Sequence, residues 1–115
     1  MAGEVIRGEI RLYRFPSPDK ERPVLVLTRT SAIRYLTYVT VAPITSTIRD
    51  IPTEVVLDER DGMKRPCAIN LDHIITVPRV RLGRRVAAIG AERLDEVVSA
   101  IAFALGFEQL DARDE

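Results

Sequence analysis

Residues 36–44 read LTYVTVAPI, a long run that is rich in β-branched and aromatic side chains. Such side chains fit the pleated surface of a sheet, so this run predicts one long strand. Pro43 has no backbone N–H and therefore predicts a bulge or an unpaired ladder position near the end of that strand. A second run, PVLVLT at residues 23–28, is continuously aliphatic and is typical of a strand covered on both faces. The centre of the chain is thus expected to be a buried β-sheet.

Shorter strands are predicted on both sides of these two runs. Residues 8–15 alternate Ile10 and Leu12 with polar or aromatic side chains, which is the period of a half-buried strand. No regular element is predicted for the polar stretch that ends at Arg34. Further strands are expected at residues 53–57, 66–71, 73–78 and 80–89, with a turn at 58–64 that carries Gly62. Five to seven short strands joined by short turns predict a mainly β protein that closes into a compact barrel.

The sequence changes to a helical period at residues 90–105. The apolar side chains that fall on one helical face are Leu94, Val97, Val98, Ile101, Ala102 and Leu105. Acidic side chains in the first turns favour the positive end of the helix dipole, and Gly106 is placed to end the helix. We therefore expect a C-terminal amphipathic α-helix, followed by a disordered tail at residues 111–115.

The length and composition of the chain favour one globular domain. With 115 residues the chain is long enough for a single core and too short for two ordinary domains, so residues 1–110 are expected to form one domain. Hydrophobic residues make up 46% and charged residues 30%, a balance that excludes a disordered chain. No apolar run approaches the roughly 20 residues needed to cross a bilayer, and no export signal is evident, so a cytoplasmic protein without a membrane partner is expected.

Cys67 is the only cysteine and His73 the only histidine. An intrachain disulfide is therefore excluded, as are a zinc site built from cysteines and histidines and catalysis by a pair of histidines. Cys67 stands among apolar neighbours and is expected to be a small buried hydrophobe. No metal or other cofactor is expected.

The formal net charge of zero conceals an uneven distribution of charge. Residues 1–90 carry 15 basic and 10 acidic side chains, a balance of +5, whereas residues 91–115 carry 2 basic and 7 acidic side chains, a balance of −5. Fifteen of the 17 basic residues are arginines, whose planar fork suits bidentate contacts with phosphate. The basic part therefore indicates a polyanionic partner, although a merely solvated arginine-rich surface has the same composition.

Polar side chains stand where two predicted strands begin and end. Arg22 precedes one aliphatic strand, and the run 45–47, Thr-Ser-Thr, ends the other. Neighbouring strands would bring a guanidinium and several hydroxyls together at one rim, and these donors suit a phosphate group. The alternative is that Arg22 is a solvated loop residue and that the hydroxyl run is only a turn.

Five short motifs relate these residues to a known family. They are GEI at 8–10, RPVLV at 22–26, VAPITS at 41–46, NLDHI at 70–74, and IG at 89–90 before the predicted helix. In this order and spacing, over roughly residues 7–107, the chain resembles the MazF/PemK family of toxin–antitoxin ribonucleases. The segments 15–23 and 70–78 are most similar to the short-loop, mycobacterial-type members.

The resemblance implies a small SH3-like β-barrel that works as a homodimer and is inhibited by a cognate antitoxin. It also implies metal-independent cleavage of single-stranded RNA through attack of a ribose 2′-hydroxyl on the adjacent phosphorus. The family's catalytic arginine falls on Arg22 and its catalytic threonine on Thr45, with Ser46 as a neighbouring substrate contact. Because arginine stays protonated at neutral pH, the role expected for Arg22 is electrostatic stabilisation of the transition state.

Further RNA contacts are implied by the resemblance. Asp72 and His73 occupy positions where family members contact RNA bases. The alternative is that His73 begins a strand and hydrogen-bonds locally. Tyr13 and Phe15 have rings on which bases stack, with core packing as the alternative for at least one of them. The segment between Phe15 and Pro23 is shorter than the loop of many family members. An open site that accepts messenger RNA or tRNA loops is therefore expected.

Two functions from other classes fit the same barrel. A CcdB-like inhibitor of DNA gyrase binds a protein and cuts nothing, but that family relies on a C-terminal end with Trp, and this chain has no Trp. A catalytically inert barrel that only binds RNA or an antitoxin would not need both Arg22 and Thr45. RNA cleavage is therefore the favoured hypothesis.

Overall fold

The computed structural model describes residues 4–16 and 20–107, and seven strands are found there. The strands are β1 Glu9–Arg14, β2 Glu21–Val26, β3 Tyr38–Thr45, β4 Glu54–Leu57, β5 Cys67–Asn70, β6 Ile75–Pro78 and β7 Arg85–Ala88. The α-helices are α1 Thr30–Ile33 and α2 Ala91–Leu105, and the short 3₁₀ turns are η1 Glu59–Asp61, η2 Leu71–His73 and η3 Arg79–Arg81. The tail predicted at residues 111–115 lies outside the described residues.

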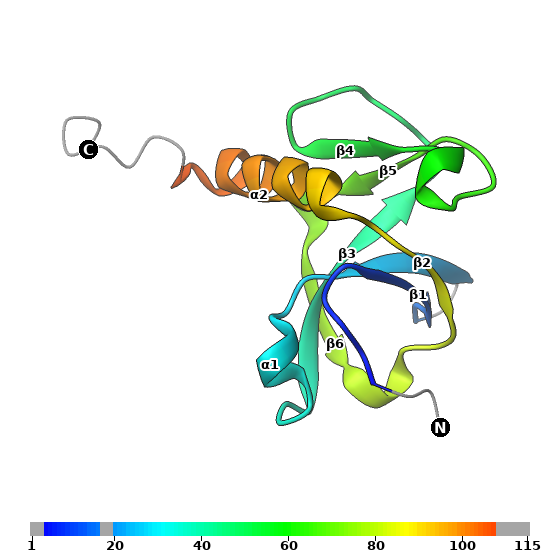
Figure 1. Ribbon diagram of the computed structural model, residues 1–115, viewed down its shortest axis with the longest axis vertical. Coiled ribbons are helices and arrows are strands. Elements are labelled where there is room, and N and C mark those ends of the chain that lie inside the picture. Colours follow the sequence, from blue (N-terminus) through cyan, green and yellow to red (C-terminus); the bar gives the residue numbers. More distant parts are fainter. Residues whose placement is uncertain (1–3, 17–19, 108–115) are drawn as a thin grey trace.

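Strand β3 is the centre of a curled antiparallel sheet (Figure 1). The strand order is β4-β5-β3-β2-β1-β7, and β6 also pairs with β3. One edge of β3 pairs with β2, while the other edge pairs first with β6 and then, at Ile44 and Thr45, with β5. Because one long strand serves three partners, the sheet bends around it. The predicted mainly β fold with five to seven strands and a C-terminal helix is confirmed.

Pro43 lies at the position where β3 changes partners. Thr40 directs its backbone groups toward β2, since Leu27 N donates to its carbonyl (2.9 Å) and Thr40 N donates to Thr28 Oγ1 (2.8 Å). Backbone groups of alternate residues point to opposite edges of a strand, so residue 43 faces the other edge. There it falls between Val41, which still pairs with β6, and Ile44, which pairs with β5. Pro43 therefore occupies the predicted unpaired ladder position. It faces the gap between β6 and β5, the two strands that η2 connects.

Two apolar cores lie on opposite faces of the sheet. Helix α2 covers the first core, where Val97 and Ala100 pack with Ile10, Leu25 and Ile69. The second core contains Tyr13, Val24, Val26, Val39, Val41 and Val77. Cys67 belongs to the first core and is 5% exposed, which confirms the prediction of a buried hydrophobe. Each fully buried aliphatic side chain contributes roughly 1.5–3 kcal/mol, so the two cores fix the positions of the strand ends.

Strand β1 is buried on both faces, whereas its sequence alternation predicted one exposed face. Glu9 and Arg11 are only 6% and 2% exposed. Arg11 Nε donates to Glu9 Oε1 (3.0 Å), and its other nitrogens donate to the carbonyls of Gly83 and Glu4 (3.0 Å each). The pair is tolerated in the interior because its charges oppose each other and its donors are used.

The structure also corrects the predicted face of helix α2. Val98 and Leu105 are 64% and 56% exposed, while Ala100, which lay outside the predicted face, is buried. The helix ends at Gly106 as predicted, with φ at 80°, a left-handed conformation that glycine adopts without strain. No helix in the described part of the chain is long and apolar enough to span a membrane.

Two short elements were not predicted. The polar stretch before Arg34 forms α1, a single turn of four residues. The expected strand at 80–89 begins only at Arg85, because residues 79–81 form η3.

Candidate active site

Arg22 and Thr45 come together at one rim of the sheet. The pairs between β2 and β3 are Val24↔Pro43, Leu25↔Ala42 and Val26↔Val41. The ladder between β2 and β3 ends at Val24↔Pro43, and the same antiparallel register continued for two more residues would set Arg22 opposite Thr45. Directly opposite residues point to the same face, where their Cβ atoms lie about 4.5–5.5 Å apart. The guanidinium and the hydroxyl therefore project from neighbouring strand ends on one face of the sheet.

The local structure leaves both side chains available for a ligand. Arg22 is exposed and forms no ion pair with any other described residue. Thr45 is half-buried, and its Oγ1 accepts a hydrogen bond from Thr47 N (3.1 Å). This bond uses one lone pair of the hydroxyl and leaves its proton free to donate. Ser46 and Thr47 follow as exposed residues, so the hydroxyl run lies beside Thr45 at the rim.

Asp72 and His73 lie on the other side of β3 from Arg22. They belong to η2, which connects β5 to β6 along the edge of β3 that does not pair with β2. Thr53 Oγ1 donates to Asp72 Oδ2 (2.6 Å), and Asp72 N donates to Asn70 Oδ1 (3.0 Å), so this carboxylate is held in place. Both residues are exposed. The structure thus places them beside the Arg22–Thr45 rim and not within it.

Tyr13 and Phe15 have different environments. Tyr13 is 8% exposed and belongs to the second core, while Phe15 is half-buried. Their rings meet edge to face, with centroids 4.9 Å apart. Both line an open hollow of 430 Å³ together with Arg14, Pro16 and Arg81. Phe15 can therefore offer a ring to a base, whereas Tyr13 supports that ring from the core.

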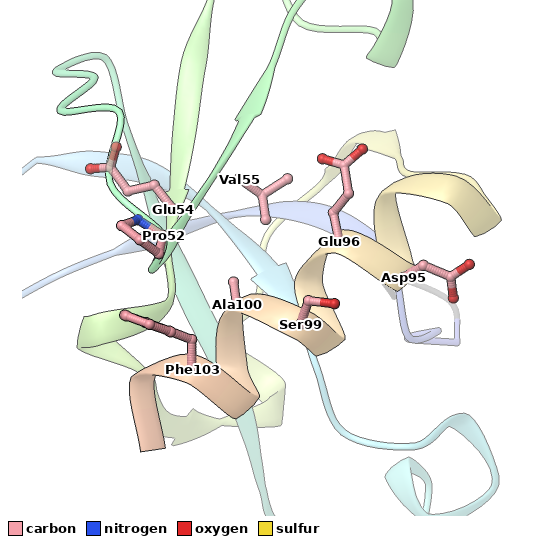
Figure 2. Close-up of a pocket in the computed structure, with 8 residues that line it drawn as sticks. All are labelled: Pro52, Glu54, Val55, Asp95, Glu96, Ser99, Ala100 and Phe103. Atoms are coloured by element: carbon pink, nitrogen blue, oxygen red, sulfur yellow. The ribbon is translucent and has the colours of Figure 1, made fainter. Parts of the chain in front are cut away.

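A second hollow, of 550 Å³, is unsuited to RNA (Figure 2). Figure 2 shows it between helix α2 and the start of β4, with Glu54 on one side and Asp95 and Glu96 on the other. Glu54 Oε1 accepts from two backbone N–H groups, and within the described structure its buried Oε2 has no partner. Three carboxylates around an apolar floor repel a phosphate backbone, so this hollow is not the RNA site.

Other groups in the structure do not supply a nucleophile or a metal site. Burial raises the pKa of the Cys67 thiol, so it stays protonated and inert at neutral pH. Within residues 4–16 and 20–107, no group of three or more His, Cys, Asp or Glu side chains is placed to hold a metal ion. The described chemistry at the rim therefore consists of hydrogen-bond donors and positive charge.

The described fold is a curled, mainly β sheet with a C-terminal helix, and one rim of the sheet carries hydrogen-bond donors and positive charge. A model of the family described as PemK-like, MazF-like toxin of type II toxin–antitoxin system matches residues 6–105. The chain belongs to this family, which confirms the resemblance seen in its motifs.

Similar proteins of known name support the same assignment. Endoribonuclease MazF3 of Mycobacterium tuberculosis is 42% identical over 83 residues, covering 72% of this chain and 81% of the relative. The solved structure of Mycobacterium tuberculosis toxin MazF-mt6 matches with a TM-score of 0.79 at 38% identity, over 85% of this chain and 96% of that one. A mycobacterial endoribonuclease in complex with its cognate antitoxin has the same fold, with a TM-score of 0.79 at 24% identity over 89% of this chain and 95% of that one.

Proposed function

We propose that this toxin cleaves single-stranded RNA at the rim where β2 begins and β3 ends, with Arg22 and Thr45 as its catalytic residues. The β2–β3 register supports this proposal, because its continuation two residues beyond Val24↔Pro43 would bring Arg22 opposite Thr45. The relatives of this chain are named endoribonucleases, which makes RNA cleavage the activity of the enzyme. A gyrase inhibitor or an inert barrel is correspondingly disfavoured.

The proposed reaction is a transfer within the RNA strand. The 2′-hydroxyl loses its proton and attacks the adjacent phosphorus, the P–O5′ bond breaks, and the 5′-oxygen takes up a proton. The products are a 2′,3′-cyclic phosphate and a 5′-hydroxyl. Negative charge grows on the non-bridging oxygens during the attack, and Arg22 with the Thr45 hydroxyl would donate hydrogen bonds to them. One such preorganised donor is typically worth about 2.7–4 kcal/mol of transition-state stabilisation.

Cleavage of total RNA in EDTA, with the new 5′ ends mapped, tests both the activity and the metal independence. An oligonucleotide carrying the mapped sequence is then compared with the same oligonucleotide bearing a single 2′-deoxy substitution at the cut site. We expect cleavage of the first and none of the second. Loss of activity in EDTA, or persistent cleavage of the deoxy substrate, would contradict the proposed chemistry.

We also propose that the toxin works as a homodimer. Helix α2 leaves apolar side chains in water, since Val98, Phe103 and Leu105 are 64%, 48% and 56% exposed. A second copy packed on this helix would remove that surface from water. Sedimentation at micromolar protein should give a dimer, and Val98→Glu with Phe103→Glu should shift it toward the monomer. A wild-type monomer would contradict the proposal.

Membership of a toxin–antitoxin family leads us to expect an antitoxin that competes with RNA for the basic part of the surface. An acidic, partly apolar segment that folds on binding would imitate the charge of RNA. Inhibition by the antitoxin of the neighbouring gene should be competitive with RNA and should weaken as salt rises. Inhibition that is indifferent to RNA concentration would contradict this mode.

A further inference from the structure

Five exposed cations form a second basic surface next to the proposed active site. They are Arg14 at the end of β1, Arg81 in η3, Arg84 before β7, and Lys64 and Arg65 after η1. We call these five residues the basic track. In Figure 1 the elements that carry them lie on the same side of the molecule, where the chain runs from η3 through β7, beside β1 and below the turn that follows η1.

The basic track begins beside Arg22. Tyr13 is paired with Arg22 across β1 and β2, and Tyr13 and Arg14 line the 430 Å³ hollow whose far wall is Arg81. Phe15 lies in the same hollow. The first two cations of the track and an aromatic ring thus share one depression, one strand away from the proposed catalytic arginine.

Backbone contacts hold the middle of the track against β1. Leu12 N donates to Arg84 O (3.1 Å), and Gly83 N donates to Leu12 O (2.7 Å). A Cβ at residue 83 would stand 3.1 Å from Leu12 O, so glycine permits this close approach. Arg84 is thereby fixed one strand further from the site than Arg14. Strands in a sheet are about 4.8 Å apart. Since β7 is at the edge of the sheet, the track takes one such step, from β1 toward β7.

A second hollow continues the track. It measures 330 Å³ and is lined by Gly62, Met63, Lys64, Arg65, Arg84 and Val86. Arg84, which stands just before β7, therefore lines the same hollow as the two cations of the turn after η1. The lining alternates apolar side chains with positive charge, which suits a single strand whose bases and phosphates both need contacts.

Three carboxylates near this side are bound to other cations, whereas the exposed Glu21 and Glu59 take part in no ion pair among the described residues. Glu9 is paired with buried Arg11 (3.0 Å), Asp58 with Arg60 (3.0 Å), and Asp61 with Arg93 (3.1 Å). Glu21 stands opposite Arg14 in the register, although no ion pair joins their side chains. In the part of the chain that the structure describes, no ion pair involves a residue of the basic track. Its positive charge is therefore available to a ligand.

We propose that the basic track binds the phosphate backbone of the RNA strand beyond the cleaved bond, so that the toxin grips a longer segment than the one it cuts. This inference rests on the proposed RNA cleavage and extends it. The track holds one cation at the end of β1 and four in the segments before β7 and after η1, which offers several positive charges to a nucleic-acid backbone. The aromatic ring in the first hollow favours RNA over an acidic peptide, because it offers a stacking surface to a base.

The test compares substrates of two lengths that share the mapped cleavage sequence. One is about five nucleotides long, and two others extend it by about ten nucleotides on the 5′ or the 3′ side. The variants are Arg81→Gln with Arg84→Gln, and Lys64→Gln with Arg65→Gln. The control is Arg29→Gln with Arg34→Gln, two exposed arginines that flank helix α1.

We expect each track variant to raise KM for one of the two extended substrates at least fivefold more than for the short one. The control should raise KM equally for all three. An equal change on short and extended substrates by a track variant would overturn the inference, as would no change at all.

Salt dependence provides a readout that does not require cleavage. Binding is measured by fluorescence anisotropy on the extended RNA with a 2′-deoxy group at the cut site, at several salt concentrations. Each track variant removes two charges and should reduce the slope of log K against log salt by about 1.4, since one contact with a single strand contributes about 0.7. A track variant with the same slope as the wild type would overturn the proposal that the basic track binds RNA. A track variant that escapes inhibition by the antitoxin while its RNA slope is unchanged would assign this surface to the antitoxin. That result would also overturn the proposal of RNA binding.

The two levels of the proposal fail in different ways. If the wild-type chain cuts no RNA in the mapping experiment, the proposed function is wrong, and the anisotropy slopes measured on an unmodified single-stranded RNA of the same length still decide the track. If RNA is cut and the slopes do not change, only the track is wrong.

Discussion

Arg11 and Arg22 lie on neighbouring strands of one sheet and have opposite environments. Arg11 is 2% exposed, and its guanidinium donates to Glu9, Gly83 and Glu4. Arg22 is exposed and unpaired among the described residues. Both residues are arginines, so the difference lies in their N–H donors. An arginine whose donors are already used is structural, and one whose donors are free is available for chemistry. This difference predicts that substitution of Arg11 changes stability and that substitution of Arg22 changes activity.

The largest effect is expected for Arg11→Ala, which leaves buried Glu9 with only the more distant and exposed Arg85 (3.8 Å) as a cationic partner. Breaking a buried ion pair in this way typically costs about 3–5 kcal/mol. Urea unfolding, followed by circular dichroism, measures the change in the free energy of unfolding. The double variant Glu9→Gln with Arg11→Met removes both charges and should recover a large part of the loss. An Arg11→Ala protein as stable as the wild type would show that the pair is not structural.

Arg22→Ala should have the converse phenotype. We expect the cleavage rate to fall at least a hundredfold, about 2.7 kcal/mol, because a preorganised donor is lost. The free energy of unfolding should change by no more than about 0.5 kcal/mol, since the side chain is exposed. Arg29→Ala, another exposed arginine close to β2 in sequence, is the matched control and should cut at the wild-type rate. Near-normal turnover of Arg22→Ala would move the active site elsewhere.

Arg22→Lys tests whether charge alone is sufficient at this position. A lysine keeps the charge and loses the planar fork that contacts two phosphate oxygens. We expect the rate to remain at least tenfold below that of the wild type. Full recovery by lysine would mean that Arg22 acts only as a point charge.

A smaller effect is expected at the contact between helix α2 and η1. Arg93 Nε and a terminal nitrogen donate to the Asp61 carboxylate (3.1 Å each), and Arg93→Ala should cost about 1–2 kcal/mol. Burial alone would raise the pKa of Asp61, but hydrogen bonds from Arg93 and from Asp58 N outweigh it and hold that pKa below its ordinary value.

The lowered pKa of Asp61 gives the same contact a pH dependence. A carboxyl with a depressed pKa in the folded state stabilises the fold fully above its unfolded pKa of about 3.9, and this contribution is lost as the pH falls through the lower folded pKa. The stability difference between the wild type and Asp61→Asn should therefore shrink in urea unfolding below about pH 4. A difference that stays constant down to pH 2 would contradict this assignment.

The sequence predicted best those features that depend on local pattern. Side-chain type and backbone geometry predicted the strands around residues 23–28 and 36–44, the unpaired ladder position at Pro43 and the end of helix α2 at Gly106. The change of β3 partners at Pro43 was not predicted. The sequence predicted less well the features that depend on what another segment contributes. Alternation in β1 indicated an exposed polar face, because nothing local reveals that Arg11 finds acceptors on Glu4 and Gly83.

The candidate site shows the same division between features that follow from local pattern and features that depend on other segments. The hydroxyl run lies at a strand end as predicted, since β3 ends at Thr45. The catalytic roles of Arg22 and Thr45, which come from the motifs, stay predictions. Arg14 and Arg81 were not singled out, since they are only two among fifteen arginines until the fold brings them into one hollow with Phe15. On helix α2 the predicted face included Val98 and not Ala100, because the shift of the buried stripe depends on how the helix lies on the sheet.

The central claim is that Arg22 and Thr45 act together on one phosphate, and a double-mutant cycle on the single-turnover cleavage rate tests it most directly. Arg22→Ala and Thr45→Ala are measured singly and combined, on one substrate and with unfolding curves for each variant. Groups that serve the same transition state are strongly non-additive. If each single variant loses about a hundredfold, the double variant should lie less than about tenfold below the slower of the two. A double variant slowed by the full product of the single effects, or a single variant with the wild-type rate, would contradict the account.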